Sequence, residues 1–167
     1  MAGADSTSIV LRAIFYFLMK NPDKLAKIRA EIDAAFANGT LSHPAQYNAA
    51  ITLPYLNAVI KESVRLFPSF QVSMPRYAPA RGLELCGKHI PAGYRVGMNP
   101  YVVQRNQVAF GEDADNFRPE RWLEGEERTR AMDKASISFG AGTRQCTGKN
   151  VVNPMDPLPR SNVLTLA

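Results

Sequence analysis

Apolar side chains recur every three or four residues in three stretches of the chain, over residues 2–19, 25–36 and 56–67. This spacing places them on one face of an α-helix. Helix boundaries agree with it, because Pro22 suits the first turn of a second helix and Pro68 stops the third. The pattern therefore predicts three helices in this part of the chain, the second of which ends at Asn38-Gly39.

The pattern changes after Pro68. Residues 71–77 are predicted to be extended. In residues 82–98, apolar and polar positions alternate and glycines at 87 and 93 mark turns, which is typical of small antiparallel strands. A short helix is predicted over residues 101–108. Residues 110–132 are polar and largely aperiodic, which predicts a long loop. The fold class expected is mainly α with a small antiparallel β region.

Composition narrows the class of protein. A chain of 167 residues with 46% hydrophobic residues suggests about one domain. The net charge of +5 is scattered and forms no clustered basic stretch, so we expect no nucleic-acid partner. Two cysteines far apart indicate a reduced, intracellular protein. The longest apolar run, Ile9 to Met19, contains Arg12 and is shorter than the ~20 residues that span a bilayer, so no membrane anchor or signal peptide is expected.

One glycine-rich stretch carries the candidate chemistry. It runs Phe-Gly-Ala-Gly-Thr-Arg-Gln-Cys-Thr-Gly from Phe139 to Gly148 and presents Cys146 from a tight loop. A zinc site is disfavoured, because no pair among the cysteines and histidines has the short spacing of structural zinc ligands. A nucleophile needs a base, and neither His43 nor His89 is tied to Cys146 by any sequence feature. A haem ligand remains, and a buried, inert thiol is the plain alternative.

The same stretch resembles the haem-binding loop of cytochromes P450. The positions that match the family pattern are Phe139, Gly140, Gly142, Arg144, Cys146 and Gly148. Glu62 and Arg65, together with Arg121 in Pro-Glu-Arg-Trp, resemble the family's structural Glu-Arg-Arg network. Without the resemblance, Glu62 and Arg65 are an ordinary helical ion pair worth about 0.3–0.5 kcal/mol.

The resemblance covers residues 1–150, as the C-terminal part of a P450 domain from the end of its I helix to the haem-binding loop. The surrounding sequence also resembles fungal pisatin-demethylase-type members. Residues 151–167 are unrelated to the family and, with three prolines near their start, are predicted to be a disordered tail.

The resemblance implies roles for further residues. Cys146 would bind the iron of haem b, Arg76 and Arg144 would hold its propionates, and Val72 and Met74 would line the substrate pocket. Asp5, Ser6 and Thr7 would be the oxygen-activation segment, in a helix locally distorted by glycine. Read alone, Asp5-Ser6 is a helix N-cap. Residues 110–132 would be the meander that leads to the haem loop.

The activity implied is haem-thiolate monooxygenation of a small organic substrate with O2. Electrons would come from NADPH through a cytochrome P450 reductase or a similar donor, and a full-length relative would lie at the endoplasmic reticulum membrane. Three alternatives stay open: an enzyme of this fold that is not a monooxygenase, such as an isomerase or peroxygenase; a haem-binding protein of this fold without turnover; and a truncated fragment without function.

Overall fold

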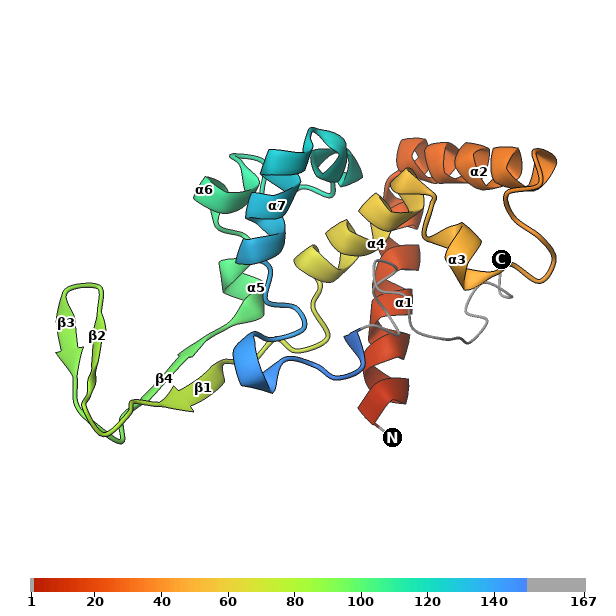
Figure 1. Cartoon of the computed structure of the whole chain (residues 1–167). Helices are drawn as coiled ribbons and strands as arrows, with labels where there is room; N and C mark the ends of the chain where they lie inside the picture. The colour runs from red at the N-terminus through yellow and green to blue at the C-terminus, as the bar shows by residue number, and fades with distance from the viewer. Residues whose placement is uncertain (1, 150–167) are drawn as a thin grey trace.

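A computed structural model describes residues 2–149 of the chain. The tail predicted over residues 151–167 lies outside these residues. The N-terminal half is helical (Figure 1), with α1 (Ala2–Lys20), α2 (Pro22–Ala37), the short α3 (Tyr47–Ala50) and α4 (Pro54–Leu66). The three predicted helices are therefore confirmed.

Four short strands follow in two separate antiparallel pairs. The strand β1 (Met74–Tyr77) pairs with β4 (Arg95–Met98), and β2 (Leu83–Leu85) forms a hairpin with β3 (Lys88–Ile90). The hairpin extends away from the helices (Figure 1). Its turn places both Cys86 (φ 51°) and Gly87 (φ 73°) at positive φ, as a two-residue hairpin turn requires. Cys86 is a free thiol exposed at this turn.

The region after the strands contains more helix than the sequence pattern predicted. The single helix expected over residues 101–108 is two short ones, α5 (Pro100–Val103) and α6 (Gln107–Phe110), and the side chain of Asn106 caps the second by accepting a hydrogen bond from the Ala109 amide. The 3-10 helix η1 (Pro119–Leu123) and the helix α7 (Glu126–Ala135) lie where a long loop was predicted. That prediction was wrong because α7 is largely exposed and fully buries only Met132, so it lacks an apolar stripe.

The helix α4 lies between two apolar clusters and belongs to both. Val59 contacts the first cluster, which α1, α2 and the residues around α3 complete with side chains such as Leu18, Ile28 and Leu41. Ala58, the preceding residue, contacts the second cluster, whose other buried members are Phe110, Ala114, Trp122 and Met132. Because adjacent helical residues point to different faces, α4 joins the helical half to the segment that precedes the cysteine loop. Within the described residues, no helix is long and apolar enough to cross a membrane.

Candidate functional site

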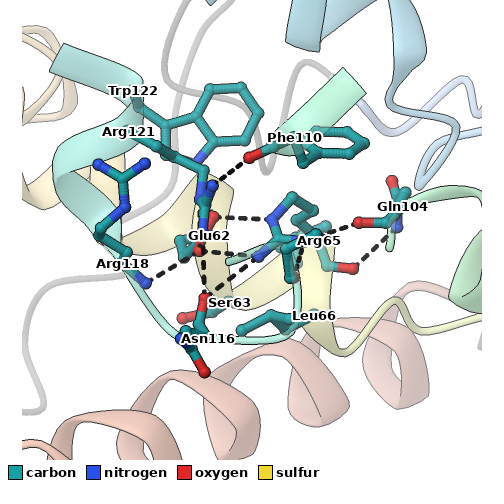
Figure 2. Close-up of polar contacts among 12 residues, drawn as sticks. Glu62, Ser63, Arg65, Leu66, Gln104, Phe110, Asn116, Arg118, Arg121 and Trp122 are labelled. Atoms are coloured by element: carbon teal, nitrogen blue, oxygen red, sulfur yellow. Dashed lines mark hydrogen bonds and ion pairs between the residues drawn. The ribbon is translucent and has the colours of Figure 1, made fainter. Parts of the chain in front are cut away.

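Glu62 on α4 is the centre of a buried polar network (Figure 2). Arg65, one helical turn later, donates from Nε and Nη2 to the two carboxylate oxygens, each at 2.9 Å. Arg121 Nε and the Trp122 indole N–H also donate to this carboxylate at 2.9 Å, and the Arg118 amide does so at 3.0 Å. Glu62 and Arg121 are 0% exposed and Arg65 is 1% exposed. Glu62 and Arg65 do form a helical ion pair, but the pair is fully buried and shared with Arg121, so the interpretation as an ordinary helical pair is wrong.

The guanidinium groups of the network bind the backbone of residues 104–116. Arg65 Nη1 donates to the carbonyl oxygens of Gln104 and Ala114 at 2.6 and 2.7 Å. Arg121 donates to the carbonyls of Phe110, Asp113 and Asn116. A buried charge is tolerated only when it is paired and its donors are satisfied, and both conditions hold here. The network thus fixes the path of an irregular segment that has little secondary structure of its own.

Asp113 supplies a second negative charge at the edge of the network. Its carboxylate accepts from Arg121 Nη1 at 3.1 Å and from Arg118 Nε at 2.5 Å. Desolvation by itself raises the pKa of Asp113, but the hydrogen bonds from Arg118 and Arg121 outweigh it, so the pKa lies below its usual value. Two arginines at the centre of the network, Arg65 and Arg121, therefore lie beside two carboxylates, those of Glu62 and Asp113.

The helix α2 forms polar contacts with both α4 and η1. Glu31 accepts hydrogen bonds from the Tyr55 and Leu56 amides, both at 2.8 Å, so it caps the N-terminus of α4 from a neighbouring helix. Glu120 of η1 accepts from Lys27 at 2.6 Å and from Lys24 at 3.2 Å. Partial burial raises the pKa of Glu120, but the hydrogen bonds led by that from Lys27 prevail and lower it to about 2.

The loop that carries Cys146 is closed by its own backbone. The Cys146 amide donates to the Phe139 carbonyl at 2.8 Å, and the Gly140 amide donates to that of Ile137 at 2.9 Å. Gly140 has φ 72°, and a Cβ there would lie 3.2 Å from the Arg144 carbonyl oxygen, so glycine is required for both reasons. The short 3-10 helix η2 (Gly142–Arg144) forms the tip. Residues 141–147 are exposed and Cys146 is a free thiol, so the alternative of a buried, inert cysteine is wrong.

The other residues of the predicted loop lie around this thiol. Phe139 and Gly148 are half-buried, and Gly142, at the start of η2, has φ 63°. A Cβ at Gly148 would stand 3.8 Å from the Cys146 Sγ, an ordinary contact distance. The absence of a side chain at Gly148 therefore keeps one flank of the sulfur open.

The predicted oxygen-activation segment lies within α1. Asp5 is exposed, while Ser6 and Thr7 are half-buried. A single α-helix runs from Ala2 to Lys20, so Asp5 and Ser6 lie inside it rather than at an N-cap, and the helix is not interrupted at Gly3. The Ser69 hydroxyl donates to the Ser6 carbonyl at 3.1 Å and ties this helix to the segment after α4.

Arg76, Val72 and Met74 are on or beside β1, whereas Arg144, the other predicted propionate residue, is in η2. Arg76 is exposed within the strand, and its Nη1 donates to the adjacent Pro75 carbonyl. Arg144 is exposed in η2, and among residues 2–149 neither arginine forms an ion pair. Val72 is 63% exposed and Met74 is half-buried. The structure thus brings Glu62, Arg65 and Arg121 into contact, whereas among residues 2–149 no hydrogen bond or ion pair joins Cys146 to Asp5, Arg76 or Val72.

A groove of about 870 Å³ lies between α1, the end of α4 and α5. Ile9, Tyr16, Phe67 and Tyr101 give it an apolar lining, and Arg12 and Arg105 add positive charge. Neither Cys146 nor the predicted substrate residues Val72 and Met74 line it. This groove is therefore separate from the predicted site.

Sequence reasoning missed several members of the network. The sequence pattern predicts a loop around Asp113 and indicates no role for Gln104, Arg118 or Glu120. The Pro-Glu-Arg-Trp stretch is the part of this region that the sequence does mark, because its Arg121 and Trp122 side chains both donate hydrogen bonds to Glu62. The partners of Arg65 are mainly backbone carbonyls, which every residue type carries, so no sequence pattern marks them.

Comparison with known proteins gives consistent matches. The family model described as cytochrome P450 matches residues 1–153. The chain is 61% identical over 151 residues to cytochrome P450 monooxygenase ACRTS1 of Alternaria alternata, covering 90% of this chain and 40% of that protein. It is 47% identical over 150 residues to cytochrome P450 monooxygenase cicH of Emericella nidulans, covering 90% and 30%. A cytochrome P450 monooxygenase of Aspergillus terreus is 46% identical over 151 residues, with 90% and 31% covered. The chain thus spans between 30% and 40% of the length of these relatives.

Proposed function

The chain belongs to the cytochrome P450 family, and from this premise we propose that it supplies the thiolate-bearing part of a haem-thiolate monooxygenase. The observation that carries the proposal is the exposed, free Cys146 on a loop with glycine at positive φ. A thiolate ligand donates electron density to haem iron, which is the chemistry that favours O–O cleavage when haem is bound.

The residues present fit a haem group. Cys146 is an accessible sulfur donor, and a glycine-rich backbone allows a flat macrocycle to approach it closely. Arg76 and Arg144 are exposed guanidinium groups with no carboxylate partner among residues 2–149, so they are suited to the propionates of haem b. Exposed apolar side chains in the segments around β1 and β4, such as Phe70, Val72 and Met98, suit contact with a porphyrin or an organic substrate.

Each predicted residue has a role in this proposal. Cys146 binds the iron, Arg76 and Arg144 hold the propionates, and Glu62, Arg65 and Arg121 keep the preceding segment in place. Phe139, Gly140, Gly142 and Gly148 shape the loop. Asp5, Ser6 and Thr7 carry protons to the oxygen-binding side, since a carboxylate and hydroxyls can pass protons along hydrogen bonds. Val72 and Met74 contact the substrate.

The reaction proposed inserts one atom of O2 into a small organic substrate and releases the other as water. Its balance requires two electrons and two protons, and NADPH supplies the electrons through a cytochrome P450 reductase or a similar donor. The three relatives described above are each named monooxygenase, which supports this reaction class.

A ferrous–carbon monoxide difference spectrum of the purified chain, reconstituted with haemin, tests the proposal. We expect a Soret band at the wavelength typical of thiolate-ligated haem, lost in Cys146→Ser and kept in Cys86→Ser. Cys86 is a matched control because it is also an exposed, free thiol. Failure to take up haem, or a spectrum that Cys146→Ser leaves unchanged, would overturn the proposal for this chain. Haem uptake without NADPH-dependent turnover when reductase is added would favour the second candidate, a haem-binding protein without monooxygenase activity.

A further inference from the structure

Gln104 is a fully buried amide, 0% exposed, in the segment between α5 and α6. Its Nε2 donates to the Arg65 backbone carbonyl at 3.0 Å. Its Oε1 accepts hydrogen bonds from the hydroxyls of Ser136 at 2.9 Å and Ser138 at 2.5 Å. Because a carbonyl can only accept and an amide nitrogen can only donate, the Arg65 contact fixes which way the amide points.

These contacts join two parts of the molecule that are distant in sequence. Arg65 belongs to the buried network of Glu62, and Figure 2 shows Gln104 beside it. Ser136 and Ser138 lie just before the cysteine loop, in which Phe139 accepts the hydrogen bond of the Cys146 amide. The Ser138 hydroxyl also lies 3.3 Å from the Val64 carbonyl of α4. One side chain therefore connects the end of α4 with the entrance of the loop.

We propose that Gln104 is a positioning residue that sets the cysteine loop relative to the buried Glu62 network through Ser136 and Ser138. The functional part of this inference rests on the proposed haem-thiolate function, because the group being positioned is Cys146. The geometry itself is independent of haem. Gln104 touches neither the thiol nor its loop tip in the described structure, so it acts only through the serines.

Both serine hydroxyls donate to the same acceptor, Oε1 of the fully buried Gln104. The Ser138 hydroxyl has one further contact, at 3.3 Å from the Val64 carbonyl, so Gln104 supplies the shorter of its two hydrogen bonds. Loss of the Gln104 acceptor removes hydrogen bonds that join two elements, and we expect the less constrained element to move in response. That element is the loop, since α4 is held by its own backbone bonds and by the Glu62 network, whereas residues 141–147 are exposed.

Amide hydrogen exchange of the full chain without haem tests the geometry. Gln104→Leu keeps the volume approximately and removes all three hydrogen bonds of the amide. We expect the amides of Gly140, Gln145 and Cys146, all bonded within the loop, to exchange about tenfold faster, the factor for one lost buried hydrogen bond. The amides of α2 should be unchanged. Gln107→Leu is the matched control, because Gln107 is exposed three residues later, and it should leave loop exchange as it is.

Ser138→Ala keeps the test decisive if Gln104→Leu does not fold. It should speed exchange of the same loop amides, and in the double variant Gln104→Leu/Ser138→Ala the two effects should not add, as expected for residues that act through one contact. The inference is overturned if loop exchange is unchanged in Ser138→Ala, or if exchange rises equally in α2 and the loop.

The second readout concerns haem. In the reconstituted chain, Gln104→Leu should lower the fraction of carbon monoxide complex with the thiolate-type Soret band, while Gln107→Leu keeps it. An unaltered fraction would overturn the role toward Cys146. If the parent chain takes up no haem at all, the proposed function fails, whereas the exchange experiment still decides whether Gln104 positions the loop.

Discussion

Arg121 Nε lies 2.9 Å from Glu62 Oε1 across 59 positions of sequence, and both side chains are 0% exposed. The contact joins α4 to η1, two elements that also share the apolar cluster of Ala58, Phe110 and Trp122. A buried ion pair stabilises little relative to an apolar pair, but breaking it leaves an uncompensated charge. The Glu62–Arg121 pair therefore fixes the position of η1 relative to α4.

Removal of the Arg121 guanidinium should strongly destabilise the fold. Arg121→Met is expected to lower the free energy of unfolding by about 3–5 kcal/mol, because the fully buried Glu62 carboxylate loses one of its cations, and the part-exposed Asp113 loses the same cation. Urea denaturation followed by circular dichroism measures it. Arg130→Met is the control, since Arg130 forms an exposed i, i+4 pair with Glu126, and it should change stability by about 0.5 kcal/mol or less. Similar effects of the two substitutions would contradict the burial argument.

Loss of the Glu31 carboxylate should destabilise the N-terminus of α4. Glu31→Ala should destabilise the chain by about 0.5–2 kcal/mol, the usual cost of losing an N-cap acceptor. Exchange of the Tyr55 and Leu56 amides should rise most, because these amides lose their acceptors. Asp33→Ala, an exposed carboxylate on the same helix, should leave both amides unchanged. Unaltered exchange at Tyr55 in Glu31→Ala would show that the cap adds nothing.

These contacts show what the sequence could and could not predict. The helices α1, α2 and α4 follow from apolar spacing, and the Cys146 loop follows from glycines whose positive φ other residues rarely adopt. The helix α7 was missed because its residues pair with one another on an exposed surface, as Glu126 does with Arg130. Gln104 was missed because its partners are a backbone carbonyl and two serines more than 30 positions away. Glutamine in a short loop carries no sign of burial.

Stability should fall in acid through Glu120. Its pKa is lowered from 4.5 to about 2 in the folded chain, so the unfolded state binds a proton first as the pH falls. The contribution of Glu120 is therefore fully present above the unfolded value of 4.5 and is lost progressively as the pH falls toward about 2. Unfolding free energies measured across this range should show a steeper pH dependence for the parent chain than for Glu120→Gln. Equal slopes would mean that the bonds from Lys24 and Lys27 do not favour the ionised form.

The glycine at the entrance of the cysteine loop gives the last prediction. Gly140→Ala places a Cβ 3.2 Å from the Arg144 carbonyl oxygen at φ 72°, and a left-handed conformation costs a non-glycine residue about 1–2 kcal/mol. Because the Cys146 amide is bonded to Phe139, the residue just before Gly140, we expect faster exchange of that amide. Gly3→Ala is the matched control, since Gly3 lies in α1 with no atom within 4 Å of an added Cβ, and it should stabilise the helix by up to about 1 kcal/mol. If Gly140→Ala leaves the exchange of Cys146 unchanged, the loop tolerates a side chain there, and the positive φ of Gly140 is not what holds the thiol in place.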